Sequence, residues 1–138
     1  MNAGPRPTSL RASDEWYRWM VQSVTGYAIF STDLEGRIVT WDEGAERLFG
    51  YHRDDVKGEN ARFIFTPEDI ARRQPEKERL DASADRIGLD ERWHVKKDGT
   101  VFWGSGLMML LLDDHQREVG FIKIVRDRTD EKRGEPVR

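Results

Sequence analysis

The run from Thr100 to Leu112 constrains the fold most, because it contains no charged residue in a chain that is 36% charged. It is preceded by Asp98-Gly99, a dipeptide typical of tight hairpin turns because glycine tolerates a positive φ. It is followed by the polar segment Asp113 to Gln116 and then by another β-rich run. The stretch Trp93 to Asp127 therefore predicts a three-stranded antiparallel meander. A middle strand that is apolar on both faces must be covered on both, so we expect the rest of the chain to wrap it.

Composition limits the classes of function. A chain of 138 residues predicts one domain with a core of its own. The absence of cysteine excludes disulfides, thiolate metal sites and nucleophilic thiols. The 23 basic and 26 acidic residues nearly cancel, which does not favour nucleic-acid binding. The longest apolar run, Gly106 to Leu112, is shorter than the roughly 18 residues that a membrane-spanning helix needs, and the start lacks the pattern of a signal peptide. We expect a cytoplasmic domain that binds neither nucleic acid nor a membrane.

The N-terminal residues predict a leader and a helix. Residues 1–12 are expected to be disordered, and residues 13–25 to form an amphipathic helix capped by Ser13. Apolar residues recur there at helical spacing, namely Tyr17, Met20, Val21 and Val24. Trp16 and Trp19 widen this face, which leaves two interpretations open. The helix lies on the sheet, or its aromatic surface serves self-association.

The middle of the chain predicts a hairpin, formed by Tyr27 to Thr32 and Ile38 to Trp41, and then a series of short helices. The helix signals are Asp42 as a cap, Gly50 as a terminator, the start Thr66-Pro67, and Pro75, which ends one helix and begins the next. The last helix, to about Asp85, offers a core only Leu80 and a few alanines, so we expect a solvated face. The order of elements predicts an α+β fold, with five antiparallel strands half-wrapped by helices around a small cavity.

Catalytic sets are not apparent in the sequence. His52, His94 and His115 match no metal-binding spacing, and no glycine-rich loop is placed to bind phosphate. The serines lack a neighbouring base, and the paired acids fall in turns and caps. We therefore expect no enzyme activity, no catalytic residue and no metal site.

The polar residues of the predicted sheet are more informative. Gly104 and Gly106 share a strand face with Met108, which leaves room either for a ligand or for a closely packed helix. His94 is either a hydrogen-bonded core residue or a polar contact at the edge of a cavity. Lys123 is unusual in so apolar a strand, and either extends outward or pairs with an acid.

Several motifs together resemble a PAS domain. The run Ile38 to Tyr51, with the sequence IVTWDEGAERLFGY, is similar to the start of such domains. Their C-terminal half is resembled by WHVKKDGT at 93–100, Phe102-Trp103, Gly120-Phe121 and Asp127-Arg128-Thr129. The resemblance covers residues 26–130 and implies the strand order 2-1-5-4-3. It also implies a sensory or dimerisation module, most often of a histidine kinase or a cyclic-dinucleotide enzyme, with signal output through Asp127 and Thr129. Residues 131–138 would then be a charged tail or linker to an effector that we expect outside this chain.

The run Gly58 to Ile64 is similar to the flavin-binding motif of light-sensing LOV domains, Gly-X-Asn-Cys-Arg-Phe-Leu. Ala61 replaces the photoreactive cysteine, so no cysteinyl adduct can form. His94, Gly104 and Val125 align with the three amides that bind the flavin ring, and each lost hydrogen bond costs about 1 kcal/mol or more. Haem-binding PAS domains carry a histidine in the region that corresponds to residues 66–85, where this chain has none. We therefore expect neither flavin nor haem.

The resemblance implies a signal-sensing and dimerisation module, for which a sensor histidine kinase of a two-component system is the expected context. Candidate contacts for an unidentified small molecule are Phe63, His94, Gly104, Met108 and Val125. Candidate homodimer contacts are Trp16, Trp19, Met20, Ile122 and Ile124. Two alternatives remain open. One is a flavin- or other cofactor-binding photosensor or redox sensor without adduct chemistry, and the other is a scaffold whose cavity is filled by its own side chains.

Overall fold

The computed structural model describes residues 27–134, and five antiparallel strands form one sheet within them. The strands are β1 (Tyr27–Thr32), β2 (Ile38–Trp41), β3 (Ile87–Val95), β4 (Val101–Leu112) and β5 (Glu118–Asp127). Their order in the sheet is β2-β1-β5-β4-β3, as predicted. The uncharged strand β4 pairs with a strand on each side and is therefore not at an edge. The helix predicted at residues 13–25, with Trp16, Trp19 and Met20, lies outside the described residues.

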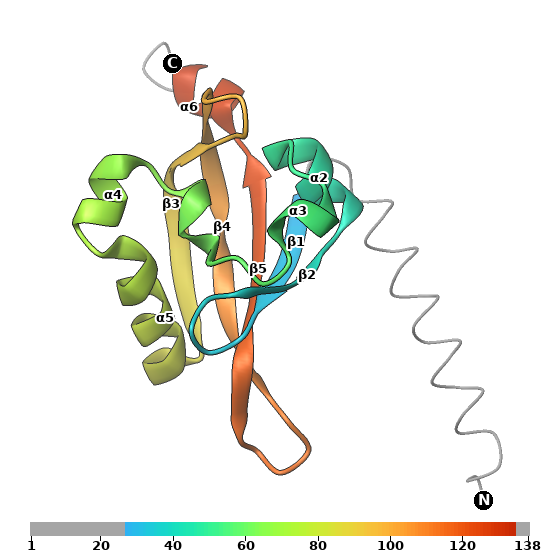
Figure 1. Cartoon of the computed structure of the whole chain (residues 1–138). Helices are drawn as coiled ribbons and strands as arrows, with labels where there is room; N and C mark the ends of the chain where they lie inside the picture. Colours follow the sequence, from blue (N-terminus) through green and yellow to red (C-terminus); the bar gives the residue numbers. More distant parts are fainter. Residues whose placement is uncertain (1–26, 135–138) are drawn as a thin grey trace, which may run out of the picture.

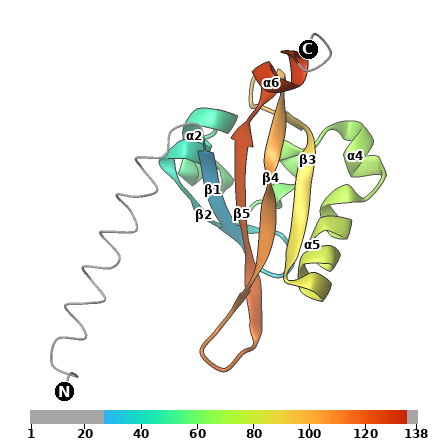
Figure 2. The same ribbon diagram turned by 180° about the vertical axis from the view of Figure 1, so that it is seen from behind.

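The helices between β2 and β3 cover one face of the sheet (Figure 1). They are α2 (Glu43–Phe49), α3 (Arg53–Val56), the 3-10 helix η1 (Ala61–Ile64), α4 (Pro67–Ala71) and α5 (Gln74–Asp85). Seen from behind, the strands lie in front of these helices, and the β4–β5 hairpin extends beyond the other strands (Figure 2). A short helix, α6 (Thr129–Gly134), follows β5 at the opposite end of the sheet. One face of β4 is thus covered by helices, while its other face is partly exposed among the described residues.

Local sequence signals explain where the helices begin and end. The Asp42 carboxylate accepts a hydrogen bond of 2.7 Å from the Ala45 amide, and Gly50 ends the same helix with a φ of 88°. Thr66 caps α4, with Pro67 in its first turn. Helix α5 is bounded differently, because Arg73 before it and Arg86 after it have φ angles of 61° and 73°. This left-handed conformation is unfavourable for a side chain with a Cβ atom.

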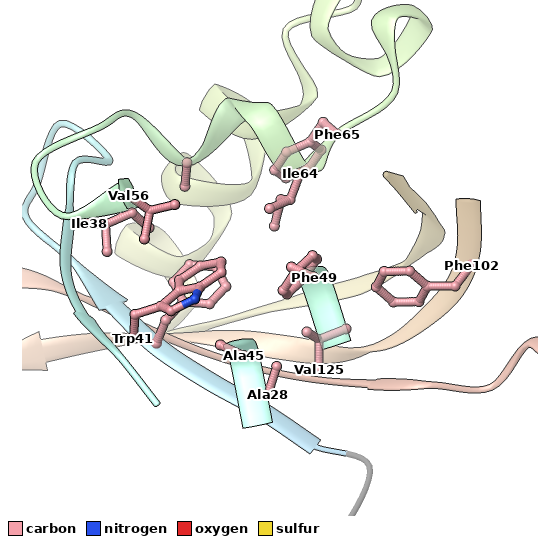
Figure 3. Packing of buried hydrophobic residues seen from close by; sticks show 12 residues of the cluster. Ala28, Ile38, Trp41, Ala45, Phe49, Val56, Ile64, Phe65, Phe102 and Val125 are labelled. Carbon is pink, nitrogen blue, oxygen red and sulfur yellow. The ribbon is translucent and has the colours of Figure 1, made fainter. Parts of the chain in front are cut away.

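Aromatic side chains from the sheet and from α2 fill most of the interior (Figure 3). The ring of Phe49 on α2 lies at the centre, with centroid distances of 5.4 Å to both Trp41 and Phe102. Phe30 packs against Trp41 at 5.1 Å. Aromatic pairs at these separations contribute beyond the area they bury, so this side of the interior is a closely packed core.

The prediction for the last helix of the insert was wrong in detail. Leu80, expected to offer apolar surface to the core, is 69% exposed. The residues of α5 that face the sheet are Glu78 and Ala82, both buried. The helix lies so close to β3 that a Cβ atom on Gly88 would come within 3.1 Å of the Glu78 carbonyl oxygen. The face of α5 with fewer large apolar residues is therefore the inner one.

Glycine at position 106 of β4 allows the backbone of β5 to approach closely. A Cβ atom there would lie 1.8 Å from the Ile124 carbonyl oxygen of β5. We predict that Gly106→Ala destabilises the domain by about 1–3 kcal/mol, because backbone atoms must move apart. Ser105→Ala is the control, since it places the same residue at the next position of β4, where a Cβ atom is already accommodated and the hydroxyl makes an exposed contact with Glu91. Urea unfolding should give Gly106→Ala the lower midpoint, and equal midpoints would contradict this explanation.

Candidate functional site

The space between the sheet and the helices is small. The cavity there has a volume of about 10 Å³. It is lined by Phe30, Thr32, Gly36, Ala61, Ile64, Phe65, Pro75, Glu78, Arg79, Met108 and Lys123. That volume is close to the ~10–15 Å³ that a single water molecule requires, whereas ligand pockets span about 300–1,000 Å³.

The structure brings together three of the five residues predicted to contact a ligand. A Cβ atom on Gly104 would lie 2.7 Å from Cδ2 of His94 and 3.0 Å from Cγ2 of Val125. The side chains of His94 and Val125 thus occupy the space that Gly104 leaves open. Met108 lines the small cavity, while Phe63 lies at the rim of the core, packed on Trp41 and Tyr51. A role of these residues in binding a ligand stays a prediction.

His94 is fully buried and bonded at both ring nitrogens. Its Nδ1 lies 2.8 Å from the carbonyl oxygen of Ile64 in η1, and its Nε2 lies 2.6 Å from an Asp90 carboxylate oxygen. Both neighbours are oxygen acceptors, so the contacts match the interpretation of a hydrogen-bonded core histidine. His94 thereby ties strand β3 to the helical insert.

Lys123 is paired with acids, which decides between the two alternatives left open by the sequence. Its ammonium is 2.5 Å from Oε1 of Glu78 and 3.0 Å from Oδ2 of Asp90. All three side chains are at most 1% exposed. Glu78, Asp90, His94 and Lys123 thus form a buried ionic cluster that joins α5, β3 and β5.

The environment of this cluster shifts the pKa values of its two acids in opposite directions. Burial raises the pKa of Glu78 to about 7, an effect that Asp90 reinforces and Lys123 opposes. Burial also opposes ionisation of Asp90, but the charges of Lys123 and His94 hold the pKa of that carboxyl well below its usual range. For Lys123, the attraction of Asp90 and Glu78 outweighs the burial of the ammonium and raises its pKa.

The ionic contacts continue toward α4. Arg92 donates to Asp90 at 2.7 Å and to Asp69 of α4 at 3.2 Å. Neither Glu78 nor Asp90 was singled out from the sequence. The one signal was the position of Lys123 in an apolar strand, for which an acidic partner was one of the two interpretations left open by the sequence.

The predicted output residues lie at the junction of β5 and α6. The carboxylate of Asp127 accepts a 2.8 Å hydrogen bond from the Thr129 amide, and the Thr129 hydroxyl accepts one of 2.8 Å from the Trp103 amide of β4. The Arg128 amide donates to the Trp103 carbonyl at 2.7 Å. The ammonium of Lys132 lies 4.3 Å from the centroid of the Trp103 ring. The start of α6 is therefore attached to the sheet through Trp103, near the start of β4.

The sheet face away from the helices, which Figure 2 turns toward the viewer, carries partly exposed apolar side chains in the described residues. Ile122 and Ile124 of β5 point to it, together with Leu107 and Met109 of β4, which lie opposite them in the strand register. The rings of Trp93 and Trp103 pack at 5.3 Å on the same face.

Among residues 27–134, no helix is both long and apolar enough to span a bilayer.

Comparison with known proteins agrees with this geometry. A sequence model of the PAS domain family matches residues 25–130. Two-component system protein A of Emericella nidulans is 34% identical over 123 residues, which are 88% of this chain and 18% of that protein. The chain thus spans about a fifth of that curated relative.

Two solved structures share the fold. The PAS domain of a protein from Colwellia psychrerythraea has a TM-score of 0.75 and 23% identity, over 88% of this chain and 98% of that one. An RNA-binding light-oxygen-voltage receptor has a TM-score of 0.67 and 19% identity, over 96% of this chain and 36% of that one. Together with the strand order and the family match over residues 25–130, these similarities show that the chain is a sensory domain of the PAS family.

Proposed function

We propose that this PAS domain is the signal-input and dimerisation module of a sensor histidine kinase, without catalysis of its own. The observation that carries the proposal is the attachment of Thr129, at the start of α6, to Trp103 in the sheet. A change in sheet packing would reach α6, and whatever follows it, through this contact. The identity with a two-component system protein supports this context.

The mechanism is a shift between two packing arrangements of the sheet and its helices. A stimulus can change their populations only as far as it favours one arrangement over the other. Trp103 is suited to transmit a change in sheet packing to α6. Its strand β4 pairs with β3 and β5, and its backbone forms hydrogen bonds with Arg128 and Thr129.

We further propose that the domain works without flavin or haem. The support is the interior volume of about 10 Å³ and the filling of the Gly104 space by His94 and Val125. The second candidate is a cofactor-binding photosensor or redox sensor, and the likeness to a light-oxygen-voltage receptor favours it.

Absorbance of the purified protein separates these two candidates. We predict a spectrum without the visible bands of flavin or haem, unchanged after incubation with either cofactor. A stoichiometric visible band that survives gel filtration would contradict the proposal and support the second candidate.

For dimerisation we propose the apolar sheet face that carries Ile122 and Ile124, joined by residues 13–25 with Trp16, Trp19 and Met20. In a twofold-symmetric dimer each residue contributes twice, so one charge on this face is buried in two copies. The partly exposed side chains of Leu107 and Met109 extend the apolar surface.

We predict that Ile124→Glu weakens dimerisation by at least about tenfold in Kd, which corresponds to about 1.4 kcal/mol. The measurement is multi-angle light scattering over a dilution series. Val119→Glu is the matched control, because Val119 lies on the same strand, is 49% exposed and sits by the hairpin turn. Trp19→Glu tests the contribution of residues 13–25. A dimer that resists Ile124→Glu, with the fold intact, would exclude this face.

We predict that Thr129→Val loosens α6 from the sheet, because the Trp103 amide loses its acceptor. A partly buried unsatisfied amide costs about 1–2 kcal/mol, which is a 5- to 30-fold change in an equilibrium. Hydrogen exchange of the amides of residues 128–134 should accelerate by that factor. Thr40→Val is the control, since the Thr40 hydroxyl pairs with Ser31 on the far side of the sheet. Unchanged exchange would show that this contact does not hold α6.

A further inference from the structure

One carboxylate oxygen of the buried ionic cluster has no hydrogen-bond partner among the described residues. It is Oε2 of Glu78, on the inner face of α5. The other oxygen, Oε1, accepts from Lys123. Ionised Glu78 leaves a charged oxygen buried without a donor, which costs more than the buried neutral hydroxyl without an acceptor that the protonated form leaves. The geometry therefore favours the neutral form of Glu78.

Charged and titratable groups face Glu78 from three of the elements around it. Strand β5 contributes Lys123, and β3 contributes Asp90 with His94 behind it. Helix α5 itself contributes Arg79, which lines the same cavity. Strands β1 and β4 contribute Thr32 and Met108, neither of which carries a charge.

The two carboxylates share the Lys123 ammonium unequally. Asp90 also contacts His94 and Arg92, whereas Lys123 is the charged partner of Glu78 within residues 27–134. Two neighbouring acids that face one cation do not both ionise readily. Of the two, Glu78 is the one that retains a proton.

Helix α5 has little else to hold it against the sheet. Its buried residues are Pro75, Glu78 and Ala82, and its largest apolar side chain, Leu80, points to solvent. The helix also forms one wall of the small cavity, through Pro75, Glu78 and Arg79. A change in the charge of Glu78 therefore acts on a weakly attached helix that closes the interior.

We propose that Glu78 is a proton-binding site that couples pH to the docking of α5, with the protonated form holding the helix on the sheet and the ionised form releasing it. Release exposes the interior beside Met108 and Lys123. Protons are then a stimulus for the sensory domain. Only the further step, from α5 to the output junction, rests on the proposed function.

The direction of the pH effect follows from the pKa of Glu78. Burial raises that pKa to about 7 from 4.5, so the docked state binds this proton more tightly than a released state does. Between these two values docking weakens as the pH rises, and above about 7 the loss is complete. Asp90 acts oppositely, because its pKa is held well below the usual range and its contribution is lost only in acid.

The test is hydrogen exchange of residues 74–85 in the complete 138-residue chain, corrected for intrinsic exchange rates. We expect the opening equilibrium of α5 to rise about tenfold between about pH 6 and about pH 8. Glu78→Gln, a neutral replacement, should abolish this dependence. Glu76→Gln, on the same helix but only partly buried, should behave like the unmodified chain.

A second measurement avoids dependence on a variant that fails to fold. The carboxyl carbon of Glu78, observed by NMR in the unmodified chain, should titrate near neutral pH. A titration near the ordinary value for glutamate, or α5 exchange that keeps its pH dependence in Glu78→Gln, would overturn the proposal. Dimerisation and the attachment of α6 are measured separately, so their failure would leave this result standing.

Discussion

The contact of the Lys123 ammonium with the side chains of Glu78 and Asp90 is the interaction on which the position of the outer helices depends. It joins α5 to β5 and β3, and Arg92 extends it to α4. Buried ion pairs contribute little net stability, because removing charges from water offsets their attraction. Removal of one partner is costly, at about 3–5 kcal/mol, because a charge remains buried and unpaired. The cluster therefore sets where α5 lies more than how stable the domain is.

The interior consists of two physically different parts. Near β1, β2 and α2 it is aromatic, and Phe49 is packed on several rings at once. Near β3, β5 and α5 it is ionic, and its energetics depend on protons. Burial of aromatic rings does not depend on proton binding, whereas the ionic contacts of Glu78 and Asp90 do.

Local signals in the sequence predicted most of the fold. Asp42, Gly50 and Thr66-Pro67 act within a few residues, and their hydrogen bonds are those that the sequence indicates. The hairpin at Asp98-Gly99 is similar, and together with the family resemblance it accounts for the strand order. Such features depend on neighbouring atoms alone, so a single sequence is sufficient to find them.

The candidate site was less predictable because its contacts are long-range. Lys123 left outward extension and an acidic partner equally open, and its partner Glu78 is 45 positions away, in a helix whose many charges look solvated. The prediction for Leu80 was wrong because a leucine is expected to face inward. In α5 the inner face instead carries the acidic residue Glu78. For Gly104, the pattern left two uses of the free space open, and only the packing of His94 and Val125 shows what fills it.

The backbone at the two ends of α5 has a consequence for how this helix can leave the sheet. Arg73 and Arg86 both adopt left-handed angles, at a cost of about 1–2 kcal/mol each for residues with a side chain. On undocking, both residues are free to return to an ordinary right-handed or extended conformation. Relief of backbone strain at Arg73 and Arg86 thus favours release of α5 from the sheet. Glu78 lies between these two residues in the helix, and its contact with Lys123 opposes release.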